Sequence, residues 1–119
     1  MKLEEILSNW ESVFKRGLLT FWILLLLHDR SSFPYAMNQE IEEISHGKMS
    51  ADANSIYRAL RRLGELGLVS SEFRPSDTGP NRRYYQITDQ GIRLLKSFIT
   101  QNILIFHERS VYDRICSVL

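Results

Sequence analysis

Residues 52–66 read DANSIYRALRRLGEL, and residues 67–88 continue as GLVSSEFRPSDTGPNRRYYQIT. Ser50 and Asp52 are both potential N-caps for the first stretch, which stops at a glycine, and this pattern predicts a helix. The second stretch contains two strand-like segments, 68–74 and 82–88, which favour a β-hairpin. The residues between these segments are all turn formers and predict a long loop. A helix followed by a hairpin is therefore the centre of the expected fold.

The predicted helix is amphipathic. At about 100° per residue its apolar side chains share one face: Ala59, Leu66, Leu63, Ile56 and Leu60. The opposite stripe is basic and polar and consists of Asn54, Arg58, Arg61 and Glu65, with Tyr57, Ser55 and Arg62 at its flanks. Guanidinium, amide and hydroxyl groups suit phosphates and base edges in the major groove of DNA. On an arbitrary helix, three arginines more often form only a solvated basic face.

The predicted hairpin favours DNA binding over a merely solvated face, because it is basic too. Three arginines stand at the two ends of the expected loop, beside two tyrosines. Successive strand residues point to opposite faces, so we expect Tyr85 and Ile87 to point toward the core and Tyr84 to point outward. A basic hairpin beside a basic helix forms one phosphate-facing surface. The candidate DNA-binding residues are Asn54, Ser55, Tyr57, Arg58, Arg61, Arg62, Arg74, Arg82, Arg83 and Tyr84.

Upstream of this pair, apolar patterns predict three further helices. Residues 3–14 repeat apolar side chains at steps of three and four, which is typical of an amphipathic helix. Residues 18–27 are apolar nearly all round and predict a central core helix. Pro34 suits the first turn of a short helix that ends at residues 45–47. In that helix the apolar positions are Tyr35, Met37, Ile41 and Ile44, and the water-facing ones are Glu40, Glu42 and Glu43.

After the hairpin, Thr88 is a suitable N-cap and the apolar spacing predicts one last helix. The complete order is that of a winged helix-turn-helix fold: mainly α with a small β-hairpin, class α+β. We expect residues 1–88 to form a winged helix-turn-helix DNA-binding domain with an added N-terminal helix. Residues 89–119 are expected to form a C-terminal dimerisation helix.

The first and last helices carry more apolar surface than so small a core can cover, and an uncovered patch of this kind marks an interface. A twofold dimer would also place two DNA-reading helices about 34 Å apart, one turn of DNA. The candidate dimer-interface residues are Leu3, Ile6, Leu7, Trp10, Leu95, Phe98, Ile99, Ile103 and Phe106.

The sequence resembles PadR-family regulators in three motifs with matching order and spacing: YRALRRL at 57–63, GLV at 67–69 and GPNRRYY at 79–85, followed by Thr88 and Gly91. The resemblance covers about residues 15–95. The departures from the family pattern are Pro34, Ala36 and Gly64. The resemblance implies a dimeric repressor or activator whose third helix and wing bind a palindromic operator. It also implies pairing through the last helix and, in many relatives, a small aromatic or drug-like effector at the dimer interface.

The composition fits this expectation and excludes other classes. Hydrophobic residues make up 44% and charged residues 24%, as in ordinary globular proteins. The longest apolar run is far shorter than the roughly 20 residues of a membrane span. No signal-peptide cleavage site follows it. A single cysteine fits a reducing compartment, so we expect a cytoplasmic protein.

No group of residues predicts catalysis, a cofactor or a metal site. The three histidines are scattered, and neither a phosphate loop nor a nucleophile motif is present. We expect Cys116 in the core rather than as a redox sensor. For Trp22 we favour the core, whereas Trp10 fits equally the core or a stack on a planar ligand.

The expected function is therefore sequence-specific binding of double-stranded DNA by a homodimeric transcriptional regulator, a repressor, and not an enzyme. The main alternative is a winged-helix module that coats DNA or binds another protein without strong sequence preference. A third alternative is a ligand-binding dimer that no longer binds DNA. The retained arginines of the helix and hairpin disfavour the third alternative.

Overall fold

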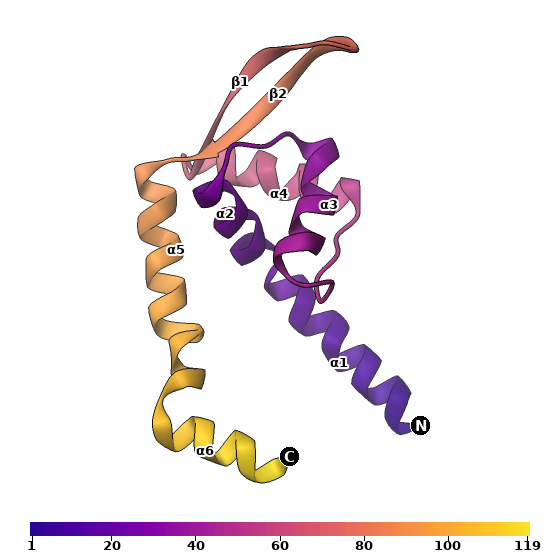
Figure 1. Cartoon of the computed structure of the whole chain (residues 1–119), viewed down its shortest axis with the longest axis vertical. Coiled ribbons are helices and arrows are strands. Elements are labelled where there is room, and N and C mark those ends of the chain that lie inside the picture. Colours follow the sequence, from indigo (N-terminus) through magenta and orange to yellow (C-terminus); the bar gives the residue numbers. More distant parts are fainter.

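The computed structural model describes all 119 residues and has the predicted element order. The elements are α1 (Leu3–Gly17), α2 (Leu19–Asp29), α3 (Pro34–Ile44), α4 (Ala53–Glu65), β1 (Val69–Ser76), β2 (Gly79–Ile87), α5 (Asp89–Asn102), the 3-10 helix η1 (Leu104–His107) and α6 (Arg109–Val118). Helices α2, α3 and α4 form the body, and the hairpin β1–β2, here called the wing, projects from one end of it (Figure 1). Helix α1 leaves the other end as one arm, and the α5–α6 segment starts at the base of the wing, runs along the side of the body and extends past it as a second arm. The predicted α+β winged-helix fold is confirmed.

Helix α2 is the centre of the core, as its all-round apolar sequence predicts. The buried cluster joins α2 to the inner faces of α3, α4, β1 and α5 and consists of Ile23, Leu24, Leu26, Leu27, Met37, Ile41, Met49, Ile56, Leu60, Leu63, Val69 and Leu95. Trp22 packs against this cluster and meets Phe21 edge-on, with ring centroids 5.1 Å apart. The core interpretation of Trp22 is therefore confirmed.

Helix α3 begins at Pro34 and ends where predicted, with His46 and Gly47 at positive φ. Two of its side chains differ from expectation. Tyr35 is 88% exposed and belongs to the surface. The Glu40 side chain is only 19% exposed, because it forms an ion pair with Arg30 instead of facing water.

The expected long loop between the strands is wrong. The strands run on to Ser76 and Gly79, and only Asp77 and Thr78 form the turn. The register shifts between Arg74 and Ser76, which is a bulge. Each strand of a two-stranded hairpin is an edge, and edges and bulges tolerate proline. The three arginines assigned to loop ends therefore lie within strands.

The predicted C-terminal helix is interrupted. Helix α5 starts at Asp89, directly after its N-cap Thr88, whose hydroxyl accepts a hydrogen bond from Gly91 N at 3.1 Å as expected. It ends at Asn102, and η1 and α6 follow as separate segments. Glu108 caps α6 by accepting a hydrogen bond from Val111 N at 3.1 Å.

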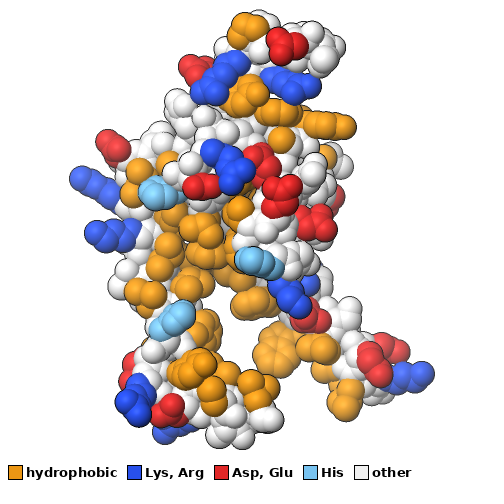
Figure 2. Space-filling view, viewed as in Figure 1, with side chains coloured by type: hydrophobic (Ala, Val, Ile, Leu, Met, Phe, Trp, Pro, Cys, Tyr) orange, Lys and Arg blue, Asp and Glu red, His pale blue; other side chains and the backbone are white.

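The far ends of the two arms, helix α1 and the η1–α6 part of the other arm, carry exposed apolar side chains. Helix α1 has no buried residue, and Trp10 is 72% exposed, so the core alternative for Trp10 is wrong within one chain. Neither η1 nor α6 has a buried residue. Hydrophobic side chains gather on the inner sides of both arms (Figure 2). No helix is both long and apolar enough to span a membrane.

Three residues of the C-terminal arm lie elsewhere than predicted. Leu95 is 5% exposed and belongs to the core, because α5 packs on α2, so it is not available to a partner. Ile99 packs partly against the same cluster. Cys116 is exposed on α6, which corrects its assignment to the core.

Candidate nucleic-acid interface

A groove of about 760 Å³ runs between the outward face of α4 and the inner face of the wing. Most of its lining residues are polar, and the full set is Asn54, Tyr57, Arg58, Leu60, Arg61, Gly64, Glu65, Val69, Ser70, Ser71, Arg83 and Tyr85. Five of the predicted DNA-binding residues meet here: Asn54, Tyr57, Arg58, Arg61 and Arg83.

Helix α4 holds its polar stripe outward because its opposite face is anchored. Ile56 and Leu60 are fully buried and Leu63 is 4% exposed, so rotation of the helix would expose the core. Leu66, predicted for the same face, is 56% exposed because it lies past the last turn as the C-cap. Arg58 is further steadied by a 3.5 Å hydrogen bond from its Nη2 to Ser55 Oγ.

The N-terminus of α4 is fixed by Asp52. Its carboxylate accepts hydrogen bonds from Ser55 N at 2.8 Å and from Ser55 Oγ at 3.1 Å. The hydrogen bond from the Ser55 backbone is the main cause that lowers the pKa of Asp52 below its usual value. Of the two predicted N-cap candidates, Ser50 and Asp52, the structure uses Asp52.

The lowered pKa predicts acid sensitivity at this cap. A carboxyl whose pKa is lower in the folded chain stabilises it above the unfolded value of about 4, and this contribution is lost as pH falls through the folded value. Asparagine caps helices as well as aspartate but does not titrate. We expect Asp52→Asn to lower the melting temperature at pH 7 and to have a smaller effect below pH 3. An equal difference at both pH values would contradict this role of the charge.

Arg83 is held over the groove from the wing side. Its guanidinium lies 4.6 Å from the ring centroid of Phe73, its cross-strand partner, and its Nη1 donates to Ser71 Oγ at 3.4 Å. Tyr85 packs on the core from the same face, and Ile87 does so too, as predicted. The stacked geometry orients the guanidinium before any ligand binds.

The other wing candidates lie on the opposite face. Tyr84 packs edge-on against Phe33 with ring centroids 5.1 Å apart, and the Arg74 guanidinium lies 4.5 Å from the Tyr84 ring centroid. Arg82 lies 4.5 Å from the Phe33 ring centroid and lines a second groove of about 360 Å³ with Tyr57. Arg74 and Tyr84 therefore do not line the main groove.

On α4, Ser55 and Arg62 also fall outside the groove, while Ser70 and Ser71, missing from the predicted set, lie in its wall. Strand alternation would have placed Ser71 on the face of Tyr85, its cross-strand neighbour. No group of three or more His, Cys, Asp or Glu side chains is placed to hold a metal ion.

Comparisons with known proteins place these features in context. The model of the transcriptional regulator PadR-like family matches residues 23–97. A PadR family transcriptional regulator from Eggerthella lenta is similar in structure, with a TM-score of 0.73 and 28% identity, over 97% of this chain and 93% of that chain. A PadR-like transcriptional regulator from Bacillus cereus has a TM-score of 0.68 and 26% identity, over 83% and 92%.

Two further proteins are more distant in sequence. Bacillus subtilis PadR in complex with operator DNA shares the fold, with a TM-score of 0.65 and 24% identity, over 71% of this chain and 48% of that chain. An uncharacterized protein from Lysinibacillus sphaericus is 24% identical over 86 residues, which are 72% of this chain and 79% of the relative.

Proposed function

Because the chain belongs to the PadR-like family of transcriptional regulators, we propose that it binds operator DNA sequence-specifically as a homodimeric repressor. The groove between α4 and the wing carries this proposal, because Asn54, Arg58 and Arg61 face Arg83 across it. The operator complex of Bacillus subtilis PadR supports it, since that protein shares the fold. We expect the protein to act in the cytoplasm and to catalyse no reaction.

Helix α4 enters the major groove in this proposal. An α-helix fits that groove, where arginine pairs with guanine and asparagine with adenine. Asn54, Tyr57 and Arg58 lie in the N-terminal half of α4, the part that reads base edges in helix-turn-helix proteins. Arg83, on the wing, is aligned for the phosphate backbone or the minor groove.

The homodimer is proposed from the arms. Their apolar side chains are exposed in the single chain, and a partner copy would cover them. Trp10, which is exposed in the single chain, would then lie at the interface, where a small aromatic or drug-like effector would stack on it. The division into a DNA-binding part, residues 1–88, and a dimerisation part, residues 89–119, belongs to the same proposal.

The experiment that tests this function is a binding titration. The purified protein is titrated with its own promoter region and with a scrambled duplex at two salt concentrations. Selective binding to a palindrome supports a regulator. Salt-sensitive binding without preference between the duplexes favours the architectural alternative. No binding to either duplex contradicts the proposal.

The groove geometry predicts different roles for its arginines. Arg58→Ala and Arg61→Ala are each expected to weaken operator binding by about 1 to 3 kcal/mol, with little effect on the scrambled duplex. Arg83→Ala should weaken binding to both duplexes and reduce the slope of log affinity against log salt by about one. Arg93→Ala, on the exposed surface of α5 outside the groove, is the matched control. Equal effects of the three groove variants on both duplexes would refute this division.

A further inference from the structure

The wing is attached to the helical body through a short extended segment, residues 30–33, between α2 and α3. Ser32 N donates to Tyr85 O at 3.1 Å, and Tyr85 N donates to Ser32 O at 2.7 Å. This isolated antiparallel bridge adds a third, one-residue strand to the base of the wing. Ser32 is 2% exposed, so the bridge is shielded from water.

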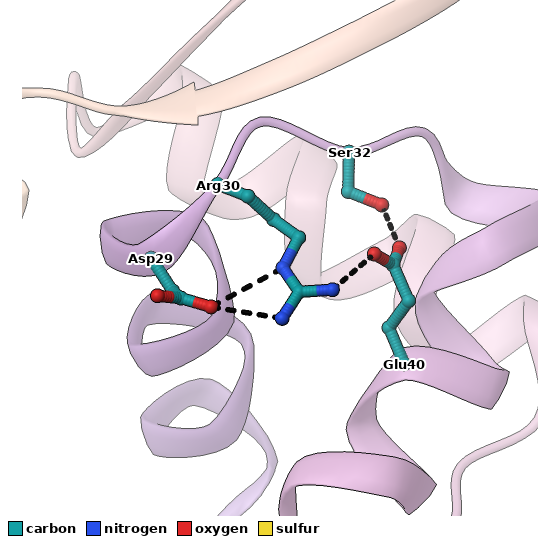
Figure 3. Close-up of polar contacts among 4 residues, drawn as sticks. All are labelled: Asp29, Arg30, Ser32 and Glu40. Atoms are coloured by element: carbon teal, nitrogen blue, oxygen red, sulfur yellow. Dashed lines mark hydrogen bonds and ion pairs between the residues drawn. The ribbon is translucent and has the colours of Figure 1, made fainter.

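Glu40 on α3 forms hydrogen bonds with this segment from the side of the helical body (Figure 3). Its Oε1 accepts a hydrogen bond from Ser32 Oγ, and its Oε2 accepts one from Arg30 Nη1 at 3.3 Å. Arg30 is held in turn by Asp29, whose Oδ2 accepts from Arg30 Nη2 at 2.9 Å and from Nε at 3.2 Å. Both carboxylate oxygens of Glu40 are thus engaged by residues 30 and 32.

The outer face of the wing rests on the same segment. Phe33 packs against Tyr84 and Arg82, and Arg74 Nη2 donates to Ser31 Oγ at 3.4 Å. Residues 31–33 contact the wing, and residues 30 and 32 contact Glu40. Glu40 itself does not line the α4–wing groove.

We propose that Glu40 is a positioning residue for DNA binding, which fixes segment 30–33 and thereby holds Arg83 of the wing at the groove. This inference rests on the proposed function. Tyr85, the residue bridged to Ser32, lines the groove next to Arg83. Movement of the segment would therefore shift the wall that carries the arginine.

The negative charge of Glu40 makes the proposal testable, because a charge effect and a positioning effect would change DNA affinity in opposite directions. An anionic side chain near a DNA-binding surface repels phosphates, so its neutralisation alone should strengthen binding. Loss of a contact that positions Arg83 should instead weaken DNA binding. Glu43, on the same helix, is exposed and its carboxylate makes no hydrogen bond or ion pair, so Glu43→Ala and Glu43→Gln are matched controls.

The experiment compares these variants in two assays. In hydrogen exchange without DNA, Glu40→Ala should speed exchange of the Ser32 and Tyr85 amides about tenfold, with Glu40→Gln intermediate because its amide oxygen can still accept from Ser32. In titrations, Glu40→Ala should weaken operator binding about tenfold and reduce the slope of log affinity against log salt. Combining Glu40→Ala with Arg83→Ala should lower the affinity little beyond Glu40→Ala alone. The Glu43 variants should bind as well as the wild type or better.

Exchange in Glu40→Ala at the rate of Glu43→Ala would overturn the proposal, as would fully additive effects of Glu40→Ala and Arg83→Ala. Melting curves identify a variant that fails to fold, in which case Glu40→Gln decides through the same exchange and slope measurements. If amide exchange is faster in Glu40→Ala but the wild-type protein binds the operator and the scrambled duplex equally, the contact between Glu40 and the wing segment is supported and the proposed function is refuted.

Discussion

Trp10→Glu is expected to convert the proposed homodimer into monomers and to weaken binding to a palindromic operator at least about hundredfold, because linkage of two half-site contacts contributes that much. Trp10 lies at the middle of the apolar face of α1, with Leu7 and Phe14 beside it, and all three are more than half exposed in one chain. A carboxylate placed in the contact that covers them would have to lose its hydration. Sedimentation velocity and the operator titration measure the two effects.

Ser8→Glu is the matched control, because it puts the same charge on the polar side of the same helix. It should sediment and bind as the wild type does. Removal of residues 103–119 should also give monomers, because it deletes the exposed apolar residues of η1 and α6, including Phe106. A Trp10→Glu protein that still sediments as a dimer would show that the α1 face is not the interface.

The sequence predicted best those features that depend on neighbours in the chain. The N-caps Asp52 and Thr88, the start at Pro34 and the stop at Gly67 are local signals, and all four occur where expected. The core helix followed from its apolar sequence alone. By contrast, the Ser32–Tyr85 bridge is a single pairing without strand periodicity, so no pattern in the sequence marks it.

Periodicity also gives the face of an element but not what that face meets. Leu95 and Phe106 continue one apolar pattern, yet Leu95 packs on α2 within the chain and Phe106 is exposed. On the wing, alternation separates Arg82 from Arg83, but only the placement of the hairpin against α4 decides which one lines the groove. Both the burial of Leu95 and the position of Arg83 depend on long-range packing, of α5 on α2 and of the wing on α4.

Gly91→Ala is expected to cause the largest loss of stability among single methyl additions in this chain. The first turn of α5 crosses the base of the wing so closely that a Cβ at Gly91 would overlap the Leu68 carbonyl oxygen and lie 2.6 Å from Ile87 Cγ1. The Leu68 oxygen cannot easily retreat, because it accepts a hydrogen bond from Thr88 N at 3.1 Å. Overpacking against backbone should lower the free energy of unfolding by about 3 kcal/mol and the melting temperature by about 10 °C.

Gly64→Ala is the matched control, and its expected effect has the opposite sign. A Cβ at Gly64 meets nothing within 4 Å outside its own helix, so alanine should gain about 1 kcal/mol of helix propensity. Both variants are compared with the wild type by urea and thermal unfolding at one protein concentration, since association alters apparent stability. If Gly91→Ala proved as stable as the wild type, the close approach of α5 to the wing would not be a rigid feature of the fold. If Gly91→Ala were destabilised while Gly64→Ala were stabilised, the close packing of α5 on the base of the wing would depend on the absence of a side chain at Gly91.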